Sequence, residues 1–127
     1  MSKTEQIYPV YGGNGITGYY DKFNVIESTI VIGRVGFYCG SIHVTKSKAW
    51  ITDNALIVEY NSNDILLSYM ELILRYANFG GKSASTAQPL VTGKIIKPYI
   101  VAIPPLQEQR RIIKAYDKII RTLKGEN

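Results

Sequence analysis

The hydrophobic and polar positions divide the chain into a β-rich stretch, a middle stretch and a C-terminal helix. In residues 7–60, short apolar runs alternate with glycines and polar turns, which is typical of strands. Asn14-Gly15 favours a tight turn after the first strand, because both residue types tolerate positive φ. Strands are therefore predicted at 7–11, 29–32, 41–45, 50–52 and 55–60.

The middle stretch, residues 61–103, begins with a predicted helix. Its apolar positions run from Ile65 to Tyr76 and occur on most sides, so the helix is expected to be buried against the sheet. Ser62 or Asp64 is the expected N-cap. The helix is expected to end at Asn78, Gly80 and Gly81, before a polar loop at 82–89 and a last strand at 99–103.

The C-terminal stretch, residues 104–127, predicts one long helix that begins at Pro104-Pro105. About 20 residues make a helix roughly 30 Å long, and only its first turns can pack on the preceding part of the chain. The rest has an apolar seam with the spacings 4, 3 and 4 of a coiled coil, so it needs a partner helix. The seam consists of Ile112, Tyr116, Ile119 and Leu123, and Ile113 and Ile120 widen it.

These elements predict an α/β (α+β) fold. A twisted, mostly antiparallel sheet carries one packed helix, and a long protruding C-terminal helix of the coiled-coil type follows. The expected compact domain is residues 1–103 and the helical segment is residues 104–127. The 127 residues suffice for one domain, and 46% hydrophobic residues predict a packed core. No apolar run approaches the ~20 residues that span a bilayer, and the single cysteine, Cys39, has no internal disulfide partner, which favours a cytoplasmic, reducing compartment.

The chain is moderately basic and rich in tyrosine. It has 15 Lys and Arg against 10 Asp and Glu, a net charge of +5, and ten Tyr. Basic side chains suit a polyanion such as DNA or RNA, since each neutralised phosphate releases counterions, and tyrosine hydroxyls bond phosphates or base edges. Both features also have plainer explanations: many small bacterial domains are basic without an acidic partner, and tyrosine is a favoured strand residue.

A glycine-rich motif, Gly13-Asn14-Gly15-Ile16-Thr17-Gly18, has the G-x-G-x-x-G pattern of dinucleotide-binding turns. Dinucleotide binding needs a helix next, and residues 19–24 lack a helical apolar period. The motif instead predicts a hairpin loop whose backbone can lie close to a ligand, with Tyr19, Tyr20 and Lys22 beside it.

Catalytic and metal-ligating residues are few. One His and one Cys exclude zinc sites built from several such ligands. His43 with Ser41 or Cys39 would be a dyad without an oriented base or an oxyanion hole, so His43 is better explained as a sheet residue and Cys39 as a small buried one. Asp53 and Glu59 are the candidate carboxylates of a small metal-dependent nuclease, although no lysine lies two residues after Glu59. We therefore expect no catalytic site, metal or cofactor.

Two further segments carry donors that suit DNA. Arg34 follows a buried strand, where its guanidinium can meet a phosphate or a guanine edge, or can instead pair with Asp53 or Glu27. The loop at 82–88 combines a base, hydroxyls and an amide, which suit phosphates and bases. A solvated loop is the alternative explanation.

Five motifs, taken together and in order, cover nearly the whole chain, residues 7–120. They are Tyr11-Gly12-Gly13-Asn14-Gly15, Ile32-Gly33-Arg34-Val35-Gly36, Trp50-Ile51-Thr52-Asp53-Asn54-Ala55, Thr86-Ala87-Gln88-Pro89-Leu90 and Ile103-Pro104-Pro105-Leu106-Gln107-Glu108-Gln109. Because it contains these five motifs in this order, the chain resembles the target-recognition domains of type I restriction–modification specificity subunits. The most specific member is the Pro-Pro-Leu-x-Glu-Gln motif that opens the long helix, residues 104–109.

The resemblance implies a DNA-binding subunit rather than an enzyme. Each recognition domain of that family reads one half of a split site in double-stranded DNA through the major groove, and the long helices pack antiparallel as a spacer. Methyltransferase subunits, which bind S-adenosylmethionine, and restriction subunits supply the chemistry. Arg34, Asn14 and Gln88 are the better candidates for base edges, and Lys and Tyr side chains for phosphates. The residues expected to contact DNA are Asn14, Tyr19, Tyr20, Lys22, Arg34, Lys46, Lys48, Lys82, Ser83, Ser85, Thr86 and Gln88.

The chain differs from that family in having one recognition domain and one helix, where the family has two of each. It is therefore expected to be a half-length subunit or a fragment. A half-length subunit is expected to pair through residues 106–123, with a second copy or another specificity half, and to recognise a two-fold symmetric split site. Two alternatives stay open. One is an adaptor or decoy that binds a methyltransferase through the same helix without touching DNA, and the other is the small nuclease.

Overall fold

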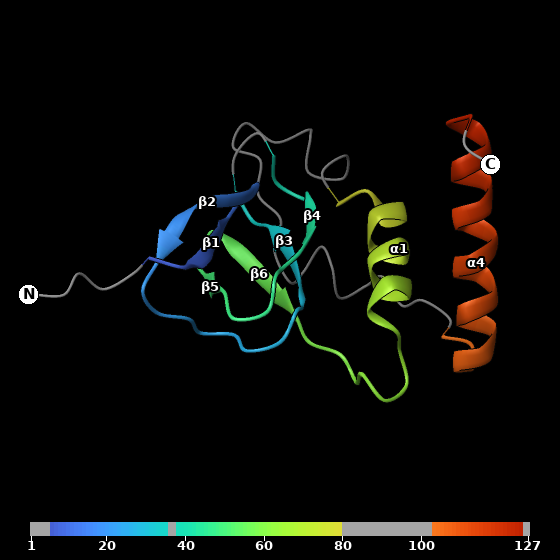
Figure 1. The fold of residues 1–127 in the computed structure, drawn as a ribbon, viewed down its shortest axis with the longest axis horizontal. Coiled ribbons are helices and arrows are strands. Elements are labelled where there is room, and N and C mark those ends of the chain that lie inside the picture. Colours follow the sequence, from blue (N-terminus) through green and yellow to red (C-terminus); the bar gives the residue numbers. More distant parts are fainter. Residues whose placement is uncertain (1–5, 36–37, 80–102, 126–127) are drawn as a thin grey trace, which may run out of the picture.

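Two small β-sheets and two helices make up the part of the protein that the computed structural model describes, residues 6–35, 38–79 and 103–125. The first sheet has the strand order β2-β1-β5, and the second has the order β4-β3-β6. Figure 1 shows the sheets on one side of α1 and α4 on the other side. The elements are β1 (Tyr8–Gly12), β2 (Gly15–Tyr20), β3 (Ile30–Gly33), β4 (Ile42–Val44), β5 (Trp50–Ile51), β6 (Ala55–Val58), α1 (Leu67–Ala77) and α4 (Leu106–Leu123).

The predicted α+β fold class is confirmed, with the strands divided between two sheets. All described strand pairs are antiparallel except β1 with β5, which is parallel. Each strand expected within residues 7–60 is present, with its ends shifted by no more than two residues. The sequence analysis missed β2. This strand pairs only with β1 at the edge of its sheet, and its glycines and exposed side chains hide the alternation that marks a half-buried strand.

Strand β3 lies at the centre of the core and is buried on both faces. Ile30 and Ile32 belong to one hydrophobic cluster, which also contains Tyr69 and Met70 of α1. Val31 points to the opposite face and packs with residues of the first sheet. All three side chains of this Ile-Val-Ile run are fully buried. A strand covered on both faces needs no polar position, which explains why this part of the sequence is a continuous apolar run.

Helix α1 packs on the second sheet as predicted, but it begins later than predicted. Leu66 is its N-cap and makes no side-chain capping bond, so the prediction of Ser62 or Asp64 as the cap was wrong. The predicted packing against the sheet is confirmed, since Tyr69 and Met70 are buried in the core cluster, whereas Tyr76 on the outer side is 92% exposed. The helix ends as predicted at Asn78, which is in the left-handed conformation.

Helix α4 begins directly after the proline pair, as predicted, with Pro105 at the N-cap. Gln109 in its first turns is fully buried, and Ile112 and Ile113 pack against the core. Figure 1 shows α4 alongside α1 and extending beyond it. Further along the helix the seam is open to solvent, with Tyr116 44%, Ile119 58% and Leu123 77% exposed and Ile120 half-buried. The prediction that only the first turns of this helix pack on the compact domain is therefore confirmed for the seam: Ile112 and Ile113 pack against the core, and Tyr116, Ile119 and Leu123 do not.

Other predicted elements fall where the structure gives no description. The polar loop at 82–89 lies outside the described residues, and so does the last predicted strand except for Ile103, which is half-exposed and not in a strand. In the described part of the chain, neither helix is both long and apolar enough to cross a bilayer.

Candidate functional site

Four segments that are distant in the sequence meet at one point, which we call the glycine junction. Ser41 donates a hydrogen bond from Oγ to the Gly13 carbonyl oxygen (2.9 Å), and the Arg34 backbone N–H donates to the Asn54 carbonyl oxygen (2.9 Å). A Cβ atom added to Gly33 would collide with the Gly13 carbonyl oxygen, so this approach requires glycine. The junction consists of Gly12–Gly15, Gly33-Arg34, Ser41–His43 and Asp53-Asn54.

The turn between β1 and β2 is fixed by Gly15 and His43. Gly12 pairs with Gly15, so the turn residues are Gly13-Asn14, one position before the predicted pair Asn14-Gly15; Gly15, the first residue of β2, has φ +87°. A Cβ on Gly15 would lie 3.2 Å from Cε1 of His43, so the imidazole ring lies directly against the turn. The turn is therefore held in one conformation by the second sheet, because His43 is part of β4.

Asn14 and His43 are joined by a hydrogen bond. Asn14 Oδ1 lies 3.3 Å from His43 Nε2. Burial lowers the pKa of His43, and the nearby Arg75 guanidinium lowers it further, so the ring is neutral at neutral pH. The neutral ring with its proton on Nε2 donates to Oδ1. The exposed Asn14 amide group then has its nitrogen free to donate to an incoming ligand.

Arg34 lies at the end of β3, and backbone atoms fix both its main chain and its side chain. Its Nη1 donates to the Asp53 carbonyl oxygen (3.1 Å). Among the described residues the ion pairs are those of Arg75 with Glu71 and Arg111 with Glu108, so the alternative in which Arg34 pairs with the carboxylate of Asp53 or Glu27 is not realised there. The Arg34 guanidinium keeps its charge and further N–H donors while one edge is held in place.

A second group of predicted residues lies at the far end of the β1–β2 hairpin. Tyr8 contacts Phe23 edge to face, with ring centroids 5.0 Å apart, and Tyr20 contacts Trp50 in the same way at 5.2 Å. Lys48 Nζ lies 5.7 Å from the centre of the Phe23 ring. We call these five residues the aromatic cluster. Their partly exposed rings and one cation form a solvent-facing surface on the first sheet.

The structure thus divides the predicted DNA contacts into two groups. Asn14 and Arg34 lie in the glycine junction, and Tyr20 and Lys48 lie in the aromatic cluster. The β1–β2 hairpin, about five residues or roughly 17 Å long, separates the two groups. Tyr19 lies on the opposite face of β2 from Tyr20, and Lys22 and Lys46 are exposed nearby in the chain without joining either group. The remaining candidates, Lys82, Ser83, Ser85, Thr86 and Gln88, lie outside the described residues.

Sequence reasoning overlooked Ser41 and His43 as members of the junction, because it considered them only as a catalytic pair. Ser41 Oγ bonds the Gly13 carbonyl and His43 bonds Asn14, so this hydroxyl and imidazole are used to fix the turn. Cys39 is buried, as expected. Within the described residues, no group of three His, Cys, Asp or Glu side chains lies close enough together to hold a metal ion. Asp53 and Glu59, the candidate nuclease carboxylates, therefore belong to no such group there.

The comparisons with known proteins agree with one another. Residues 3–127 match the family described as the type I restriction modification DNA specificity domain. Over 113 residues the chain is 30% identical to the specificity subunit of the type I restriction enzyme EcoprrI from Escherichia coli, covering 88% of this chain and 28% of that protein.

Two solved structures share the fold. One comes from a study of complex assembly and conformational transition of the type I restriction–modification system, with a TM-score of 0.69 and 19% identity over 93% of this chain and 32% of that one. The other is the crystal structure of a type I restriction–modification S subunit from M. genitalium, with a TM-score of 0.59 and 19% identity over 97% of this chain and 34% of that one. The chain therefore spans about a third of the length of these relatives.

Proposed function

Because the chain belongs to the family of type I restriction modification DNA specificity domains, we propose that it recognises a specific sequence of double-stranded DNA. In this role it directs methyltransferase subunits, and through them restriction subunits, to the site, and it catalyses no reaction itself. It needs no cofactor or metal of its own for this, and it acts in the cytoplasm.

The glycine junction is the observation that carries the proposal. Its glycines allow the backbone of the turn to lie close to a ligand, and contacts from both sheets hold the turn rigid. Arg34 and Asn14 extend from it with N–H donors still available. Guanine presents two acceptors, O6 and N7, to such donors in the major groove, and an arginine pairs with both at once. A rigid pair of donors at a chain turn suits base recognition better than catalysis.

The aromatic cluster and the exposed lysines have a complementary role. Tyr20 and Lys48, together with Tyr19, Lys22 and Lys46, carry hydroxyl or ammonium groups on the first sheet or in the loops around it. Such groups hold phosphates and set the orientation of the protein on the duplex without reading sequence. The loop from Lys82 to Gln88 is proposed as a further contact on the basis of its residue types.

The exposed seam of α4 is proposed as the pairing surface. Tyr116, Ile119 and Leu123 leave an apolar stripe in water, and such a stripe on a single helix is stabilised when a second helix covers it. The partner is a second copy of this chain or another specificity half. A two-fold pair recognises a site made of two half-sites in inverted orientation.

The experiment is a selection of bound sequences from a library of random duplexes, followed by affinity measurements on the selected site. Replacing Arg34 with Ala is expected to weaken binding to that site by about 1–3 kcal/mol and to relax the preference at one base pair. Arg111→Ala is the matched control, since Arg111 is already paired with Glu108 on α4, away from the junction. Binding to random duplex should fall steeply between about 50 and 200 mM salt. A chain that binds a methyltransferase but shows no salt-dependent binding to any duplex is an adaptor, and the proposal is then wrong.

A further inference from the structure

We propose that the side of α4 opposite its seam is a phosphate-binding surface for the duplex DNA that continues beyond the recognised bases. This inference rests on the proposed function, because it extends the DNA contact from the recognition domain to the helix. Four basic residues make up this surface, which we call the basic file: Arg110, Lys114, Lys118 and Arg121.

The basic file and the seam occupy different sides of the helix. Arg110, Lys114 and Arg121 each precede a seam residue by two positions, and Lys118 follows the seam residue Tyr116 by two positions. Two positions correspond to a rotation of about 200° in an α-helix. Arg110 therefore lies nearly opposite Ile112, and Arg121 nearly opposite Leu123. A second helix on the seam would leave the file uncovered.

The cations of the file have no carboxylate partner among the described residues. The one ion pair described on α4 joins Arg111 to Glu108, outside the file. All four members of the file are exposed. Asp117 lies in their neighbourhood without forming an ion pair in the described part of the chain. Helix α4 carries five cationic and two anionic side chains, a net charge of +3 over 18 residues of a chain whose total is +5.

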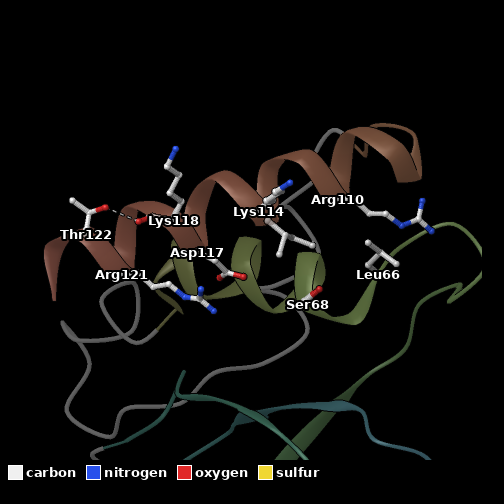
Figure 2. Close-up of a pocket in the computed structure, with 9 residues that line it drawn as sticks. Leu66, Ser68, Arg110, Lys114, Asp117, Lys118, Arg121 and Thr122 are labelled. Carbon is white, nitrogen blue, oxygen red and sulfur yellow. Dashed lines mark hydrogen bonds between the residues drawn. The ribbon is translucent and has the colours of Figure 1, made fainter. Parts of the chain in front are cut away.

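The file lies along a groove of about 660 Å³ between α1 and α4, which is shown in Figure 2. Leu66 and Ile113 contribute apolar lining to it. Arg121 and Asp117 turn toward the α1 side, whereas Lys118 points away from α1. A helix of another protein lying in the groove would reach Arg121 but leave Lys118 on the outside. A duplex passing over α4 can contact the cations on both sides of the groove edge.

The length of the file also suits a DNA backbone. The eleven residue-to-residue steps from Arg110 to Arg121 span about 16–17 Å at 1.5 Å per step. The duplex rises about 3.4 Å per base pair, so this length corresponds to roughly five base pairs. Lysine and arginine side chains are long enough to follow one strand over that distance, and they bind phosphate without regard to base sequence. The surface therefore fits a sequence-independent contact next to the recognised bases.

The test compares two duplexes with the full chain: the selected site alone, and the same site extended by about ten base pairs on either side, roughly the separation of two half-sites. Lys114→Gln, Lys118→Gln and Arg121→Gln are combined in one variant. The variant should bind the short duplex as the unchanged protein does. On the extended duplex, the slope of the logarithm of affinity against the logarithm of salt should become shallower by about 2–3, since each phosphate contact contributes about 0.9.

Single substitutions separate a local contact from a general loss of charge. Lys118→Gln and Arg75→Gln each remove one positive charge, and Arg75 lies on α1 in an ion pair with Glu71. Only Lys118→Gln is expected to lower the affinity for the extended duplex relative to the affinity for the short duplex. Equal effects of the two substitutions, or equal affinity of the unchanged protein for both duplexes, would overturn the inference while leaving the proposed function intact. Unchanged DNA binding with lost binding of a methyltransferase would assign the surface to a protein instead. Failure of the unchanged protein to bind any duplex would refute both proposals.

Discussion

The buried side chain of Gln109 joins α4 to the rest of the protein through three part-buried hydrogen bonds. Its Oε1 accepts from the Leu66 N–H (2.9 Å), and its Nε2 donates to the carbonyl oxygens of Asp64 (2.8 Å) and Pro104 (2.9 Å). The side chain is fully buried. A polar side chain without access to water is stable only when its partners are complete, and here they are.

Replacement of Gln109 by Leu tests how much this connection contributes. Leucine has a similar volume, so the main effect is that one N–H and two carbonyl oxygens lose their partners in a dry environment. An unsatisfied buried group costs about 1–3 kcal/mol, and part of this is offset because the apolar side chain is buried favourably. We expect a net loss of about 3 kcal/mol from the free energy of unfolding, a large part of the 5–15 kcal/mol typical of a domain.

The assay is urea unfolding followed by circular dichroism, with Gln107→Leu as the matched control. Gln107 has the same side chain two residues earlier and is exposed, so its replacement should change the unfolding free energy by less than about 0.5 kcal/mol. A Gln109→Leu protein that is as stable as the Gln107→Leu protein would show that the three bonds do not exist in solution, and the attachment of α4 described above would be wrong.

Three further predictions concern the junction, the seam and pH. Gly33→Ala should destabilise the protein by several kcal/mol in thermal or urea unfolding, because the added methyl group collides with the Gly13 carbonyl; Gly18→Ala, where nothing lies within 4 Å, is the control. Ile119→Asp should leave the chain folded but abolish its self-association in analytical ultracentrifugation, and a monomeric unchanged protein at tens of micromolar would refute the pairing. The pKa of His43 is lowered in the folded protein, so as the pH falls below about 6.5 the unfolded chain binds a proton at this residue before the folded protein does. The free energy of unfolding should therefore decrease from pH 7 toward pH 5, and His43→Gln should remove the part of this decrease that His43 causes.

Local patterns were sufficient to predict most of the secondary structure. The apolar run in β3, the positive φ of Gly15 and the left-handed Asn78 each depend on neighbours in the sequence, and the structure has all three. The start of α1 could not be predicted in this way. The backbone N–H of its N-cap, Leu66, bonds to Gln109, which lies 43 residues later in the chain. A contact at that separation leaves no periodic signal near residue 66.

The candidate site was predicted only in part, for a similar reason. Asn14 and Arg34 could be chosen because their residue types suit DNA and glycines surround them. The bond from His43 to Asn14 depends on the packing of β4 against the first hairpin, which a single sequence does not specify. The same limit explains why Tyr20 and Lys48 were grouped with Asn14, although they lie at the other end of the hairpin.

The contacts of Gln109 and Arg34 bear directly on how such a chain would measure a split site. Gln109 fixes the start of α4 to the segment before α1. Helix α1 packs on the cluster that contains Ile30 and Ile32 of β3, and Arg34 directly follows that strand. No step of this path is a long flexible link, so the position of the Arg34 guanidinium relative to the seam is set by packed side chains. If two chains pair through the seam, the separation of their two guanidinium groups is then fixed by the fold. A protein of this design should accept only a narrow range of half-site spacings, and Gln109→Leu should widen that range before it abolishes binding.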